Sequence, residues 1–274
     1  MSSATAVMTA QSNVAVLAKC VVPLFALTHE RELLLGGTGV LVQVANGPAF
    51  LFTAGHVLDE FARSSMFVWP QDGQPVKITG EGFTSEPQHV GRSGDPVDLA
   101  VLRIAQETAR SLSTAGFLFA DSSCMSATVP DRGVCAIIGY PHAANRPDIE
   151  RTLEGKKVTT LYADPKVIFA TACTQPDYDR ARRSRLLNII LERQRRWTKG
   201  NDGHADPRHG LKSPSGMSGG AMFSLGNEDE LELGQCSPQL AGIFTRYVDK
   251  RRFMIGANAR AMAELVRRDV RIGV

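Results

Sequence analysis

The pattern of apolar and polar positions predicts β-strands along most of the chain. Two apolar runs flank Asn46-Gly47, a pair that tolerates positive φ and so predicts a hairpin. Short apolar runs of this kind, separated by Gly, Pro and Asn turns, indicate an all-β barrel or sandwich. The runs interpreted as strands are residues 20–27, 37–44, 49–54, 65–70, 75–80, 98–104, 133–141, 157–163, 166–173, 221–224, 240–247 and 252–257.

Helical spacing is clear in two stretches, around residues 10–19 and 258–268. The run 186–197 fits a strand or an amphipathic helix, and a strand is favoured because its apolar part is short and its surroundings are β. The polar, turn-rich run 121–133 is the best seam between two halves. We therefore expect an N-terminal segment (1–19) able to form a helix, a first barrel (20–125), a second barrel (126–257) with a long insertion or loop (174–212), and a C-terminal helix and tail (258–274).

Composition narrows the class of protein. The 274 residues are 43% hydrophobic and 22% charged, as in a soluble globular protein. The net charge of +3 is too small to indicate nucleic acid as the main partner. Lys19 and Pro23 interrupt the apolar pieces near the start, so we expect neither a secretory signal nor a membrane span. The five cysteines are odd in number and widely spaced, which indicates neither a disulfide framework nor a zinc site and fits a cytoplasmic location.

The stretch Gly216-Met-Ser-Gly-Gly220 raises the possibility of a nucleophilic Ser218, and chain order narrows the catalytic system. It matches the G-x-S-x-G elbow of α/β-hydrolases, which needs a histidine after the serine. The histidines are residues 29, 56, 89, 142, 204 and 209, so none follows Ser218. The subtilisin order needs an aspartate before the histidine, and no aspartate precedes residue 59. The order His, Asp, Ser remains.

His56 and Asp98 are the best partners for Ser218 in that order. His56 directly follows a predicted strand, although an isolated histidine there is more often an ordinary loop residue. Asp98 opens the apolar run that begins at Leu99, where its carboxylate can be shielded from water and orient an imidazole. Asp95 precedes a proline and is interpreted as a turn residue.

The segments "FTAGHV", "DLAVLRI" and "SGMSGGA", in this order, resemble those around the catalytic His, Asp and Ser of the trypsin-like (chymotrypsin-fold) serine proteases. "GGTGVLVQV", "IIGYP" and "LAGIFTRY" resemble the bacterial branch that includes glutamyl endopeptidases and HtrA-type proteases. The resemblance covers about 20–260 except 142–212. It implies two antiparallel six-stranded β-barrels with an N-terminal segment and a C-terminal helix. It implies a serine endopeptidase with a protein or peptide substrate and no metal or cofactor, and the cysteine pattern leads us to expect an intracellular one.

Carried onto this sequence, the resemblance implies a role for each site residue. Ser218 would be the nucleophile, His56 the general base and then acid, and Asp98 the orienting carboxylate. The backbone N–H groups of Gly216 and Ser218 would form the oxyanion hole. Secreted relatives carry an aspartate before the nucleophile to pair with a newly cut N-terminus, whereas this chain has Met217. Control must then come from elsewhere, such as a regulatory protein partner.

The resemblance places the primary substrate pocket at Lys212, Thr245, Arg246 and Tyr247. Lys212 and Arg246 would favour an acidic substrate side chain, but long basic side chains more often extend to solvent. The basic run 180–199 is interpreted as a solvated face, because its basic residues are not interleaved with aromatic residues as base stacking requires; Trp197 is the single aromatic residue in the run. Two alternatives stay open: a catalytically silent, protease-like interaction module, or binding of nucleic acid or an acidic partner through 180–199.

Overall fold

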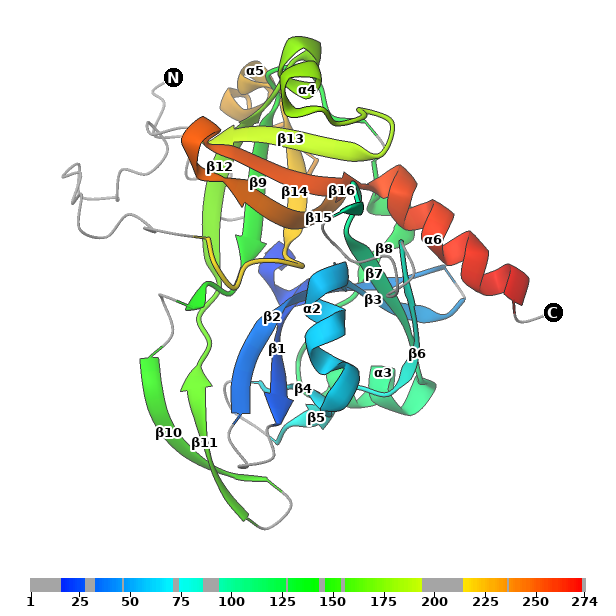
Figure 1. The fold of residues 1–274 in the computed structure, drawn as a ribbon, viewed down its shortest axis with the longest axis vertical. Coiled ribbons are helices and arrows are strands. Elements are labelled where there is room, and N and C mark those ends of the chain that lie inside the picture. Colours follow the sequence, from blue (N-terminus) through cyan, green and yellow to red (C-terminus); the bar gives the residue numbers. More distant parts are fainter. Residues whose placement is uncertain are drawn as a thin grey trace.

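The computed structural model describes residues 16–27, 33–45, 47–70, 74–85, 94–126, 128–142, 146–153, 156–193, 214–235 and 237–272. It confirms a mostly β fold built from two antiparallel sheets and a C-terminal helix (Figure 1). The first sheet has the order β5-β4-β1-β2-β3-β7-β6, with β8 parallel to β2. Its strands are β1 (Val21–Leu27), β2 (Leu33–Gln43), β3 (Ala49–Ala54), β4 (Met66–Val68), β5 (Val76–Lys77), β6 (Gly80–Thr84), β7 (Leu99–Ile104) and β8 (Ala120–Asp121).

The second sheet closes on itself as a six-stranded barrel in the order β12-β13-β16-β15-β14-β9. Its strands are β9 (Val134–Gly139), β12 (Lys166–Ala172), β13 (Asn188–Arg193), β14 (Ala221–Gly226), β15 (Gln239–Val248) and β16 (Phe253–Asn258). A separate hairpin of β10 (Arg146–Leu153) and β11 (Lys156–Tyr162) projects from the body (Figure 1). β13 confirms the strand interpretation for residues 188–193 of the run 186–197, whose residues 194–197 lie outside the described part. The strand forms barrel wall within the stretch 174–212 that we expected to be an insertion or loop.

The first sheet curls into half a barrel. Among the described residues its two edge strands, β5 and β6, do not pair with each other, so the sheet stays open. β5 has only two residues and follows Pro75, which has no N–H to extend a ladder. The hairpin predicted around Asn46-Gly47 is present, because β2 and β3 pair from Val40 with Phe52 to Gln43 with Ala49. Asn46 itself lies outside the described residues.

The structure has more helices than the two expected from spacing. They are α2 (Gly55–Glu60), α3 (Gln106–Thr114), α4 (Gln175–Ala181), α5 (Glu228–Glu232) and α6 (Ala259–Ile272), with 3₁₀ turns at Ala18–Cys20, Phe61–Arg63, Ser122–Cys124 and Asp249–Arg251. α4 and α5 begin with capping boxes, in which Thr174 or Asn227 and the acidic residue three positions later satisfy each other's backbone N–H. Of the N-terminal stretch expected to be helical, residues 10–15 lie outside the described part.

One apolar core joins the two sheets. Phe52 and Val101 of the first sheet belong to the same buried cluster as Phe223 and Ile243 of the barrel and Met262 of α6. In Figure 1, α6 runs from the barrel to the side of β6 and β7, which it contacts. This shared core fixes the seam between the sheets, where the candidate site lies. None of the helices described is long and apolar enough to span a membrane.

Candidate active site

His56 and Asp98 meet because they stand at the ends of neighbouring strands. α2 follows β3 directly, Asp98 directly precedes β7, and the last pair of these two strands joins Ala54 to Leu99. His56 Nδ1 lies 2.7 Å from Asp98 Oδ2, and the backbone N–H of His56 donates to Oδ1 at 3.0 Å. Asp98 is 3% exposed. The carboxylate thus holds the proton on Nδ1 and leaves Nε2 as the hydrogen-bond acceptor of the imidazole.

The turn before Asp98 is organised by Asp95, which sequence reasoning treated as a simple turn residue. Asp95 is 2% exposed, its Oδ1 accepts the N–H of Val97 at 2.8 Å, and its Oδ2 accepts the hydroxyl of Ser85. Ser85 Oγ in turn accepts the N–H of Leu99 at 3.0 Å. Asp98 itself has a φ of 51°, a left-handed conformation that aspartate adopts more readily than most residues. The network therefore holds an uncommon backbone shape that presents Asp98 to His56.

Asn188 of β13 and Arg183, in the segment before that strand, also reach this turn; sequence reasoning assigned Asn188 no role and placed Arg183 only in the basic run 180–199. Asn188 Nδ2 donates to the carbonyl oxygen of Pro96 at 2.9 Å. Arg183 lies close enough to Asp98 and Arg246 to interact electrostatically with both. Burial, followed by the charge of Arg246, lowers the pKa of the Arg183 guanidinium, and nearby carboxylates act in the opposite direction. Within the described part of the chain, Arg183 Nε is buried and has no hydrogen-bond partner.

Ser218 lies in the loop before β14 and reaches the same seam. Its carbonyl oxygen accepts the N–H of Thr38 at 2.9 Å. A Cβ on Gly37 would touch both that oxygen and the side chain of Val57, the residue after His56. The Ser218 hydroxyl donates to the carbonyl of Thr245 at 3.4 Å. Among the described residues no hydrogen bond joins Ser218 Oγ to the imidazole, so a reactive geometry requires the hydroxyl to rotate towards His56.

The peptide unit between Ser215 and Gly216 has a defined direction. The carbonyl oxygen of Ser215 accepts the backbone N–H of His142 at 2.8 Å. In a trans peptide the N–H points opposite to the C=O, so the Gly216 N–H points away from the His142 backbone. Gly216 has a φ of 89°, and a Cβ there would collide with His142, so this shape requires glycine.

The peptide unit between Met217 and Ser218 is fixed in the same way. The Met217 carbonyl accepts the N–H of Gly220 at 2.8 Å, so the Ser218 N–H points in the opposite direction. The Met217 side chain is fully buried in the barrel core. The N–H groups of Gly216 and Ser218 have no hydrogen-bond partner among the residues described. These are the two N–H groups that the sequence predicted as oxyanion donors.

The predicted substrate pocket is described in part. Thr245 is buried, and its hydroxyl donates to the carbonyl of Ile255 at 3.3 Å. Arg246 is half-buried beside Arg183, and Tyr247 packs against the core of the barrel. Lys212 lies outside the described residues. Of the described pocket residues, Arg246 is the basic one, and it lies near Arg183, which in turn lies near Asp98.

In the basic run 180–199, at least two arginines have acidic partners. Arg180 pairs with Asp177 at 3.2 Å. Arg185 pairs with Asp131 and lies 5.5 Å from the centre of the Tyr178 ring. Residues 194–199 are outside the described part. No group of three or more described His, Cys, Asp or Glu residues is arranged to hold a metal ion.

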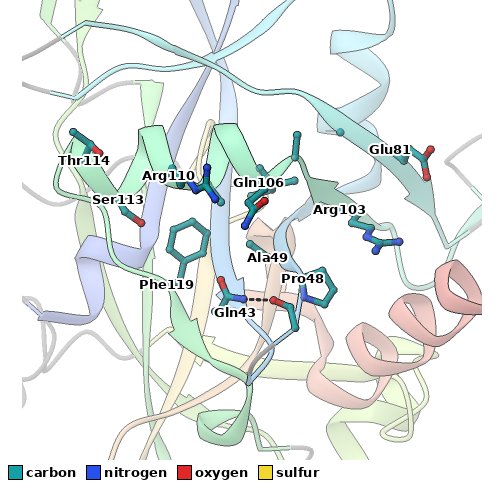
Figure 2. Close-up of a pocket in the computed structure, with 15 residues that line it drawn as sticks. Gln43, Pro48, Ala49, Glu81, Arg103, Gln106, Arg110, Ser113, Thr114 and Phe119 are labelled. Atoms are coloured by element: carbon teal, nitrogen blue, oxygen red, sulfur yellow. Dashed lines mark hydrogen bonds between the residues drawn. The ribbon is translucent and has the colours of Figure 1, made fainter.

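A surface hollow of about 1040 Å³ lies away from these residues, between α3 and the β2–β3 hairpin (Figure 2). Arg103 of β7 and Arg110 of α3 line it together with Gln43 and Gln106. None of His56, Asp98 and Ser218 contributes to its wall. It is therefore separate from the candidate active site.

Comparison with known proteins gives a distant likeness in fold. No protein-family model and no curated protein matches the chain. Among solved structures, a glutamyl endopeptidase in complex with MPD is similar, with 14% sequence identity and a TM-score of 0.47. The alignment covers 90% of this chain and 89% of that one. The chemistry of the site therefore has to be argued from the contacts within this chain.

Proposed function

We propose that the chain is a trypsin-like serine endopeptidase that uses His56, Asp98 and Ser218. The observation that carries the proposal is the pair of unpartnered N–H groups on Gly216 and Ser218, beside a histidine held by a buried aspartate. Both residues are partly exposed, so these two donors, one residue apart in the same loop, are accessible to an oxygen atom of a substrate. An oxyanion hole contributes about 3 kcal/mol of transition-state stabilisation per donor.

The proposed reaction uses these groups in the following order. Ser218 Oγ turns from the Thr245 carbonyl, transfers its proton to His56 Nε2 and attacks the peptide carbonyl carbon. The carbonyl oxygen becomes an oxyanion held by the N–H groups of Gly216 and Ser218. The C–N bond then breaks as His56 returns the proton to the leaving amine, which leaves an acyl ester on Ser218. Water, deprotonated by His56, hydrolyses the ester and restores the serine. Asp98 holds the imidazolium in place throughout.

Labelling with a fluorophosphonate tests the nucleophile directly, because this probe forms a covalent bond with an activated serine. We expect the protein to be labelled on Ser218 and the Ser218→Ala variant to stay unlabelled. Incubation with a broad peptide library should give cleavage that Ser218→Ala abolishes. Labelling that survives this substitution would disprove the assignment of the nucleophile.

The bond from Ser218 to the Thr245 carbonyl motivates a second candidate, a protease-like module that binds peptides without cleaving them. A hydroxyl held on that carbonyl is not activated by the imidazole. The same experiment separates the two functions. Absence of both labelling and cleavage, in a protein that still binds peptides from the library, would favour the binding module.

A further inference from the structure

Thr38 lies in the middle of β2 and uses all of its polar groups. It is fully buried. Its N–H donates to the carbonyl of Ser218 at 2.9 Å, and its hydroxyl donates to the carbonyl of Gly216 at 3.1 Å. The hydroxyl oxygen accepts the N–H of Tyr140 at 3.0 Å, and the Thr38 carbonyl accepts the hydroxyl of Thr53 at 2.7 Å. Thr38 of the first sheet therefore binds two carbonyls of the candidate oxyanion loop, which belongs to the barrel.

The hydroxyl of Thr38 holds one end of the peptide unit between Gly216 and Met217. That unit is also held at its other end, because the N–H of Met217 donates to the carbonyl of Pro214 at 2.9 Å. A planar unit held at both ends cannot rotate without losing two hydrogen bonds. The preceding peptide unit, between Ser215 and Gly216, carries the free Gly216 N–H. Its orientation is restricted because the next unit cannot rotate.

The N–H of Thr38 holds the peptide unit between Ser218 and Gly219. The carbonyl of Ser218 accepts this N–H, and the N–H of Gly219 donates to the carbonyl of Phe244 at 2.7 Å. Peptide units with free N–H groups and units held at both ends thus alternate along the loop. Both anchored units depend on Thr38, one through its side chain and one through its backbone.

Gly219 shows how closely the loop is seated on the first sheet. It has a φ of 88°, and a Cβ at this position would lie 1.9 Å from the carbonyl oxygen of Thr38. Such a contact is impossible for any other residue, so the loop lies directly against β2. The backbone of Thr38 is therefore in direct contact with Gly219.

We propose that Thr38 is a positioning residue that fixes the oxyanion loop from the opposite sheet. This role rests on the proposed function, because it concerns the contacts that hold the oxyanion hole of the proposed protease in shape. Met217 is an apolar core residue and cannot form an ion pair with a chain terminus, so the shape of this loop has to come from other contacts. Thr38 touches neither substrate nor reacting atoms and acts through the carbonyls of Gly216 and Ser218.

The test compares Thr38→Val, which keeps the shape and loses the hydroxyl, with Thr38→Ser, which keeps the hydroxyl. We expect Thr38→Val to slow fluorophosphonate labelling of Ser218 about tenfold and to lower kcat with little change in KM, because the oxyanion hole acts in the transition state. Thr38→Ser should stay within about threefold of the original protein. Thr108→Val is the matched control, since Thr108 is also buried and loses a side-chain bond to Thr79, away from the site.

Hydrogen exchange provides a readout that needs no activity. The N–H groups of Met217 and Gly219 are paired behind the loop, so Thr38→Val should accelerate their exchange, whereas Thr38→Ser and Thr108→Val should not. Original protein that is never labelled would disprove the proposed function, and exchange would still decide the role of Thr38. Unchanged exchange in Thr38→Val, or an equal loss of labelling in Thr108→Val, would overturn the role of Thr38.

Discussion

Asn188, the first residue of β13, donates from Nδ2 to the carbonyl oxygen of Pro96, 2.9 Å away in the turn that carries Asp98. The N–H of the same peptide unit, on Val97, donates to Asp95 Oδ1. The unit is thus held from the barrel at one end and from its own turn at the other. The packing of the two sheets is therefore coupled to the orientation of the Asp98 carboxylate.

Replacing Asn188 should reduce the reactivity of Ser218 more than it reduces the stability of the fold. Asn188→Ala removes the donor and leaves the Pro96 carbonyl with a lost hydrogen bond, worth about 1–3 kcal/mol if the group stays buried. The left-handed backbone of Asp98 then loses one of its supports, and we expect labelling of Ser218 to slow about tenfold. Labelling rates compared at equal folded fraction measure the effect.

Asn258→Ala is the control for this change. Asn258 is as buried as Asn188, and its Nδ2 donates to the carbonyl of Leu186 at 2.9 Å, but it does not touch the turn at Pro96. It should cost stability without a comparable loss of labelling. If both variants slowed labelling equally, the effect would be general loosening of the barrel.

The two aspartates of this turn should respond differently to the same substitution. Asp98→Asn keeps the shape but removes the charge that stabilises the imidazolium of His56, so labelling should fall about 10³- to 10⁴-fold. Asp95→Asn can still accept the N–H of Val97 and should cost less than tenfold. Rates of labelling for the two variants, measured side by side, check this. The reverse ranking would contradict the role of Asp98 as the carboxylate that orients His56.

Gly219→Ala should destabilise the protein through a collision. A Cβ there meets the Thr38 carbonyl at 1.9 Å, so we expect a loss of at least about 3 kcal/mol in the free energy of unfolding. Gly116 has nearly the same φ, 89°, but open space around its Cβ position, so Gly116→Ala should cost about 1 kcal/mol from backbone strain alone. Urea unfolding of both variants separates collision from strain, and equal losses would contradict the close seating of the loop.

The thiols should differ sharply in reactivity. Burial raises the pKa of Cys20, Cys135 and Cys173 to about 12, so at pH 8 these thiols stay protonated and unreactive. Cys124 is exposed. Alkylation with iodoacetamide at pH 8, mapped by mass spectrometry, should modify Cys124 in the folded protein, and Cys20, Cys135 and Cys173 only in urea; Cys236 lies outside the described residues. Rapid alkylation of a buried thiol would contradict the packing described for it.

Much of the β framework could be predicted, because strands and turns leave local signals. Alternating apolar runs marked β2 and β3, and the Asn-Gly pair marked their turn. The position of His56 was predicted after a strand, but the helix α2 that carries it was not. α3 was missed for a physical reason: among its nine residues, only Thr108 and Leu112 are fully buried, too few for an apolar stripe.

The sequence allowed the three candidate catalytic residues to be predicted, but not the residues that hold them in position. Chain order, the strand positions of His56 and Asp98, and the family resemblance selected His56, Asp98 and Ser218. The structure joins His56 to Asp98 and brings Ser218 to the same seam, where their chemistry is a prediction for labelling to test. Thr38 binds the Gly216 carbonyl across 178 residues, and Asn188 binds Pro96 across 92. The sequence around a single polar residue in a strand does not indicate a partner so far away in the chain. Such contacts can therefore be identified only from the structure.

The course of α6 has a consequence for how the protein is made. Asn258 accepts the N–H of Ala261 at the start of the helix, and Met262 and Leu265 join the buried cluster that contains Leu99 of β7. A ribosome completes the first sheet long before it reaches α6, so the nascent sheet emerges with this apolar face uncovered. This part of the cluster can be covered only after α6 has been synthesised, so a nascent chain carries His56, Asp98 and Ser218 before the packing around them is complete.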